Sequence, residues 1–259
     1  MRAFVAIPFL VVPPLAAQQV PAWATGTTRY KTTVTSEITQ EAMGQSQSTT
    51  NTTYREATMV IAKATTGLDV SIRLDTTHLT SSTGGGGPSA NLKGLTYKAA
   101  TQPGGQPTTA TVTDAAGAAS TLPIAASLRA YLPRLKPGAR RGESWVDTMA
   151  VQTDENGLAV TTTTETRFSY AGDTTLAGAK LLVIGLEASG KAKGAGDTPN
   201  GKASLEGTIT TTGRAWITPA GQLVGVETTG SIARSVMLED QGIAVTITQK
   251  QTLSTARLP

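Results

Sequence analysis

The feature that most constrains the fold of this chain is a two-residue alternation of side-chain type, which returns along most of its length. Between positions 29 and 40 the even positions read Tyr, Thr, Val, Ser, Ile, and the odd ones carry Arg, Lys, Thr and Glu. The same register returns in 68–75, and again in 158–170 after the turn signal Asn156-Gly157. Successive side chains of a strand point to opposite faces, so this period predicts half-buried β-strands.

The C-terminal half continues the pattern. The further predicted strands are 181–186, 215–218, 223–229 and 243–253. Threonine, with 46 of the 259 residues, suits such strands because its β-branched side chain fits a pleated surface and its hydroxyl tolerates water. The glycine-rich stretch 190–201 is predicted to be a flexible hairpin tip. We therefore expect a mainly β fold with about ten to twelve long antiparallel strands, forming a curved sheet, a half-barrel or a sandwich.

One segment breaks the alternation and predicts a short inserted helix over 123–132. Apolar side chains there recur at helical spacing, Pro123 suits the first turn, and Pro133 should end or bend the helix. The apolar stripe consists of Ile124, Leu128, Tyr131 and Leu132.

The N-terminus has the features of an export signal. Arg2 precedes an apolar stretch, Ala3–Leu15, which is shorter than the ~20 residues of a membrane span and contains prolines. Cleavage is expected after Ala17, with Ala24 as a second possible site. Residues 1–17 would then be removed, and the protein would act in the periplasm or outside the cell, with no transmembrane segment.

The remaining chain, 18–259, is expected to form one β-rich domain, with two possible halves at 25–115 and 141–256 on either side of the helix. Intrinsic disorder is excluded because 39% of the residues are hydrophobic and the net charge is only +4. The chain has no cysteine, which excludes disulfides, cysteine zinc sites and a lipoprotein anchor. The small net charge does not favour a nucleic-acid partner. The oligomeric state is not indicated.

Each candidate catalytic or metal site lacks residues that its chemistry requires. His78 is the only histidine, and no Gly-x-Ser-x-Gly sequence accompanies it. The stretches 185–192 and 196–203 approach a phosphate-binding loop, but each ends in alanine where a hydroxyl is needed. The acidic segments 154–157 and 239–242 are typical of tight turns. A distant carboxylate pair for glycoside hydrolysis stays open. We expect no catalytic residue, no metal and no cofactor, and a protein that is not an enzyme.

A cluster of basic residues follows the predicted helix, with no acid between positions 129 and 141. Two interpretations stay open: contact with anionic headgroups or a polyanionic envelope polymer, or a solvated linker. The cluster consists of Arg129, Arg134, Lys136, Arg140 and Arg141.

Two resemblances add to this reading. The stretch Leu-Lys-Pro-Gly-Ala-Arg-Arg-Gly-Glu-Ser-Trp-Val-Asp at 135–147, a Thr-rich hairpin, and Trp-Ile-Thr-Pro-Ala-Gly-Gln-Leu-Val at 216–224 resemble an uncharacterised family of exported bacterial β-rich proteins. The likeness covers roughly 25–256. Many such proteins are lipoproteins, and this chain departs from them in having no cysteine. The layout of a long curved sheet with one inserted helix is also similar to half-barrel lipoprotein carriers.

The leading functional hypothesis is a non-enzymatic envelope protein, a binding or carrier module whose curved sheet holds an apolar or lipid-like ligand. The helix would then form an apolar lid over the open side, and the basic residues would face water or an anionic envelope surface. The alternative is a structural or adhesive cell-surface protein without a ligand cavity. Trp145 is predicted to be buried and to pack against the helix.

Overall fold

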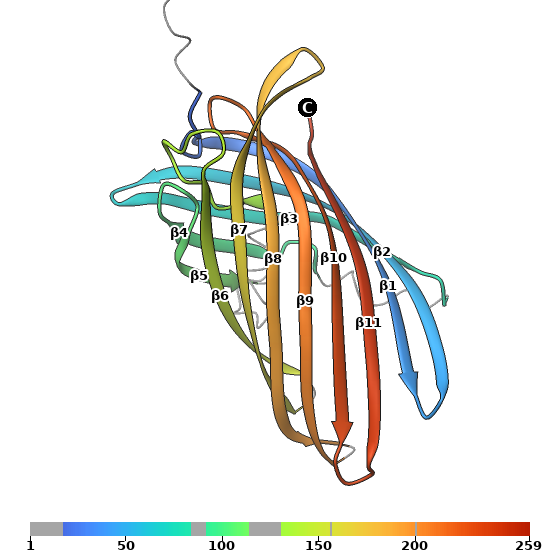
Figure 1. The fold of residues 1–259 in the computed structure, drawn as a ribbon. Coiled ribbons are helices and arrows are strands. Elements are labelled where there is room, and N and C mark those ends of the chain that lie inside the picture. The colour runs from blue at the N-terminus through green and yellow to red at the C-terminus, as the bar shows by residue number, and fades with distance from the viewer. Residues whose placement is uncertain (1–17, 84–91, 114–130, 156, 200) are drawn as a thin grey trace, which may run out of the picture.

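The computed structural model describes residues 18–83, 92–113, 131–155, 157–199 and 201–259. In this part of the chain, eleven strands form a single antiparallel sheet (Figure 1), so the protein is all-β, as the alternation predicts. The strands are β1 (Gly26–Ala42), β2 (Gln45–Ala64), β3 (Gly67–Ser81), β4 (Thr96–Thr101), β5 (Pro107–Thr113), β6 (Ser144–Glu155), β7 (Leu158–Leu176), β8 (Ala179–Thr198), β9 (Gly201–Ile217), β10 (Leu223–Leu238) and β11 (Ile243–Arg257).

The strand order is β5-β4-β3-β2-β1-β11-β10-β9-β8-β7-β6. Each strand therefore pairs with its neighbour in sequence, except that the first and last strands pair with each other, from Tyr30–Arg257 to Ala42–Val245. The sheet stays open between β5 and β6. The chain between these two edge strands, 114–143, includes both the predicted helix and the basic cluster.

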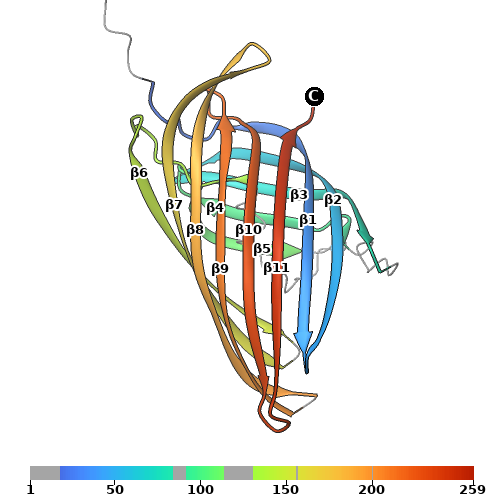
Figure 2. The same ribbon diagram turned by 45° about the vertical axis from the view of Figure 1, so that its right-hand side comes forward.

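The sheet is strongly curved, and β3, β4 and β5 cross behind the strands of the other half in both views (Figures 1 and 2). We call the side that carries the core the inner face, and the other side the outer face. The main apolar cluster combines buried inner-face side chains from both halves, among them Tyr30, Ile72, Tyr97, Phe168 and Ile184. The core therefore joins the two halves of one folded-over sheet.

A second, smaller cluster lies near the far ends of the long strands β7–β10. It contains Leu158, Val160, Ala192, Ala203 and Leu205, all buried, with Val236 and Leu238 packed against it. Two separate apolar clusters thus mark the inner face, one where the halves meet and one at the distant hairpins.

The predicted hairpin tip at 190–201 is too long: the β8–β9 connection lies within it, between Thr198 and Gly201, but β8 continues through most of the stretch. Its glycines reflect close packing: an added Cβ would lie 2.8 Å from a methyl carbon of Val160 at Gly194, and 2.0 Å from the carbonyl oxygen of Gly157 at Gly196. The glycines let β8 approach β7. The glycine-rich composition that indicated a loop is therefore a feature of a closely packed strand.

Two predictions lie outside the described residues. The signal peptide, 1–17, is one, and the helix at 123–132 falls almost entirely within 114–130. No helix in the described part of the chain has the length and apolar character needed to cross a membrane.

Candidate functional site

The predicted apolar stripe has two described members, Tyr131 and Leu132, and both are buried in the main core. The Tyr131 ring lies 6.0 Å from that of Tyr30, and its hydroxyl accepts a hydrogen bond from Thr32 Oγ1 at 3.3 Å. Burial raises the pKa of Tyr131 above its usual value. Ile124 and Leu128, the other two members, are outside the described residues.

The basic cluster is divided between paired and exposed side chains. The Arg134 guanidinium donates to the carbonyl oxygen of Val146 at 2.7 Å and lies 3.4 Å from Asp147 Oδ1. Lys136 Nζ lies 3.3 Å from Glu143 Oε2. These contacts tie two of the basic residues to the start of β6 and the chain just before it.

Arg140 and Arg141 are exposed, and Arg129 is outside the described residues. The Arg141 guanidinium lies over Gly172, where an added Cβ would come within 2.9 Å of its Nε atom. The backbone of this segment is fixed to β7, because Gly142 N donates to Tyr170 O at 2.8 Å.

Trp145, at the start of β6, is buried with 8% of its surface exposed, which confirms the first half of its prediction. Its indole is stacked on Phe168 with ring centroids 6.0 Å apart. The Nε1 atom donates to the carbonyl oxygen of Arg134 at 2.9 Å. Trp145 therefore holds the segment that enters β6 against the core.

A polar row crosses the inner face of four neighbouring strands where the main core ends. The strand registers place its members side by side: Thr77 on β3, Arg55 on β2, Thr32 on β1 and Thr255 on β11. Thr32 and Thr255 are buried and share a hydrogen bond of 2.9 Å. The hydroxyl groups of Thr32 and Thr255, half of the row, thus have hydrogen-bond partners within the row.

The other half of the polar row is not satisfied. Arg55 Nε and Thr77 Oγ1 are buried, and neither atom has a hydrogen-bond partner. Buried polar atoms normally have partners, and leaving one without a partner is costly. The Arg55 side chain as a whole is half-buried. The sequence interpretation did not identify Arg55, which stands on the same face of β2 as Ala57 and Met59.

Beyond the polar row, the inner face carries seven half-buried aliphatic side chains interspersed with threonine, glutamine and glycine residues and with Arg234 of β10. Unlike the core residues, they keep part of their surface accessible. They are Val34, Ile38, Leu186, Ile209, Ile232, Ile247 and Leu253. This stretch lies between the two apolar clusters.

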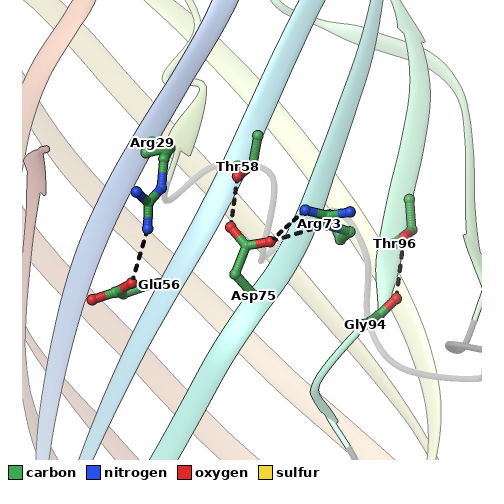
Figure 3. A network of polar contacts seen from close by, with 7 residues as sticks. All are labelled: Arg29, Glu56, Thr58, Arg73, Asp75, Gly94 and Thr96. Atoms are coloured by element: carbon green, nitrogen blue, oxygen red, sulfur yellow. Dashed lines mark hydrogen bonds and ion pairs between the residues drawn. The ribbon is translucent and has the colours of Figure 1, made fainter. Parts of the chain in front are cut away.

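The outer face is charged and threonine-rich. Figure 3 shows part of it on β1–β3, where Arg29 pairs with Glu56 at 3.3 Å and Arg73 with Asp75 at 2.9 Å. Asp75 also accepts a hydrogen bond of 2.6 Å from Thr58. Arg29, Glu56, Arg73 and Asp75 therefore form two locally neutral pairs on this face.

A groove of about 630 Å³ lies on the outer face of β7–β10. Trp216 and Arg214 on β9 line it together with Glu187, Glu227 and Arg141. A second groove, of about 620 Å³, is lined by Arg134, Lys136 and Trp145 at the basic segment. The sequence interpretation did not single out Trp216 as a groove residue.

The described residues contain no group of three or more His, Cys, Asp or Glu side chains placed to hold a metal ion. His78 is exposed on β3, beside Tyr54 of β2.

The fold and the inner face define a class of protein: an all-β protein with one open, folded-over antiparallel sheet whose partly accessible inner surface mixes aliphatic and polar side chains. Comparison of the chain with models of known protein families and with curated proteins finds no match.

Proposed function

We propose that this protein is a non-enzymatic exported envelope protein that binds or carries an apolar or lipid-like ligand on its inner face. The observation that carries the proposal is the half-buried aliphatic stretch between the two apolar clusters, in a sheet that stays open between β5 and β6. Export rests on the N-terminal sequence, with residues 1–17 as the signal peptide.

Apolar surface that stays partly accessible inside a folded sheet is available to a ligand. Ile209 and Ile232 face inward on the neighbouring strands β9 and β10, and each keeps part of its surface accessible. An apolar chain placed there would gain about 0.8 kcal/mol for each CH₂ group removed from water. Tyr131 and Leu132 support the proposal, because these members of the predicted apolar lid pack into the core that bounds the stretch.

The test is native mass spectrometry with lipid extraction of the purified protein. We expect bound lipid-like molecules in the wild-type protein, and a clear loss of them in Ile209→Glu, which puts a charge on the inner face. Thr210→Glu is the matched control, since Thr210 is the next residue along β9 and is exposed on the outer face. A wild-type protein that is always empty and indifferent to added lipids would contradict the proposal.

The second candidate is an adhesive or structural surface protein. The groove with Trp216, Arg214 and Glu227 on the outer face favours it, because a half-buried aromatic side chain that lines a groove among mixed charges suits contact with a polar polymer. Under this candidate, the Ile209→Glu substitution leaves surface attachment unchanged and Trp216→Ala abolishes it.

A further inference from the structure

Arg55 is a charged side chain on the inner face for which no hydrogen bond or ion pair is found among the described residues. Its Nε atom is buried without a partner, and so is the hydroxyl of the adjacent Thr77. The Tyr131 hydroxyl lies close enough for the positive charge of Arg55 to act on its pKa. The side chains of Arg55, Thr77 and Tyr131 thus lie at the polar row, and Arg55 and Thr77 have unused donors.

The surrounding strands supply no counter-charge. The inner-face positions of β1, β2, β3 and β11 hold no aspartate or glutamate. Glu56 and Asp75, the nearest acids along β2 and β3, pair with Arg29 and Arg73 at the outer face. On β6 the inner-face Asp147 lies beside Arg134.

Building on the proposed carrier function, we infer that the ligand is an anionic amphiphile whose acid group binds Arg55 and Thr77 at the polar row. A carboxylate or a phosphate ester offers the oxygen acceptors that the planar guanidinium and the hydroxyl lack in the protein. The Arg55 charge is then compensated by the ligand.

The position of Arg55 also determines the direction in which the apolar chain of the bound amphiphile would run. The polar row stands at the edge of the main core, and from Thr32 to Ile38 the inner face continues for six residues along β1, about 20 Å at ~3.3 Å per residue. Along β1 from Thr32 toward Ala42, Val34 and its partner Leu253 are the first aliphatic pair after the row. Ile38 and Ile232 come next, on either side of Gln249. An extended acyl chain leaving Arg55 would lie along these side chains.

The experiment compares three probes with the same sixteen-carbon chain, hexadecanoate, hexadecyl phosphate and hexadecanol, titrated into delipidated protein by calorimetry. We expect at least one of the two acids to bind the wild type tenfold or more tightly than the alcohol. In Arg55→Gln that acid should lose tenfold or more in affinity, while the alcohol is unaffected. The ratio between the two acids tells whether the site prefers a carboxylate or a phosphate.

Two variants serve as controls. Arg73→Gln removes a guanidinium from the outer face of the neighbouring strand and should change no affinity. Thr77→Val keeps the charge and removes the unpartnered hydroxyl, so it should weaken acid binding less than Arg55→Gln does. It also provides an independent test if Arg55→Gln does not fold.

The failure of this inference is distinguishable from failure of the carrier function. Equal binding of acids and alcohol to the wild type, or unchanged acid binding in Arg55→Gln, overturns the role of Arg55 and leaves the carrier in place. No binding of any probe overturns both.

Discussion

Single threonine residues have two roles that the sequence does not separate. On the inner face Thr32 and Thr255 are buried and bond to each other at 2.9 Å. On the outer face of β9 Thr208, Thr210 and Thr212 are exposed. The same residue type can therefore satisfy a polar position beside the core or cover the solvent face without forming an apolar patch.

Trp145 is the residue whose removal should most affect stability. Trp145→Ala deletes the stack on Phe168 and the hydrogen bond to Arg134 O, so unfolding should become easier by about 3–5 kcal/mol. Urea denaturation measures this loss. The control Trp216→Ala, at the outer-face groove, should cost less, and equal losses in both variants would refute the assignment of Trp145 to the core.

Tyr30 should make the protein sensitive to alkaline pH. Burial raises its pKa to about 12, whereas an unfolded phenol ionises near about 10. The neutral phenol therefore stabilises the fold fully below pH ~10, and this contribution is lost as the pH rises toward ~12.

The measurement for Tyr30 is the free energy of unfolding between pH 8 and 12, compared with Tyr30→Phe. The variant should lose about 1 kcal/mol at neutral pH, because the hydroxyl donates to Leu223 O at 3.2 Å, and its alkaline decline should be shallower. Identical slopes in the two proteins would argue against a buried neutral Tyr30.

At the scale of elements, the alternation of side chains correctly predicted an all-β antiparallel fold and the buried faces of 29–40, 68–75 and 158–170, because both depend on local period. It gave only parts of β8 and β9, and it did not single out β4, β5 and β6. The order of the strands was not predictable. The pairing of β1 with β11 joins residues more than 200 positions apart, and several strands share the same Thr-rich pattern. Arg55 was missed for a related reason: the strand around it carries Asn51 and Thr53 on the inner face, which obscures the apolar register.

The hairpin between β6 and β7 gives a prediction for a single element. Gly157 has φ +90°, and an added Cβ would lie 2.3 Å from the carbonyl oxygen of Asp197 on β8. Gly178, between β7 and β8, has φ +80° with nothing within 4 Å. Gly178→Ala should cost about 1 kcal/mol of backbone strain, and Gly157→Ala clearly more, because β8 must also move.

Thermal and urea unfolding of the two glycine variants checks this difference. Equal destabilisation by Gly157→Ala and Gly178→Ala would mean that backbone strain alone decides the cost and that the approach of β8 contributes nothing.

At the scale of the whole molecule, the two faces of the sheet differ in the charges that they carry. The outer face of β1–β3 carries acids and bases in local pairs. The inner face of β1–β3 and β11 carries Arg55 without an acid, beside half-buried aliphatic side chains. Together with the opening between β5 and β6, this asymmetry is the basis of the proposed binding of an amphiphile on the inner face.

The most direct measurement is methyl NMR of isoleucine-labelled, delipidated protein during titration with hexadecanoate. If the ligand binds on the inner face, the methyl signals of the half-buried residues Ile38, Ile209 and Ile232 shift and saturate together, while those of Ile72 and Ile217 in the core stay in place. Binding that leaves the three inner-face signals unchanged would contradict a ligand site on the inner face.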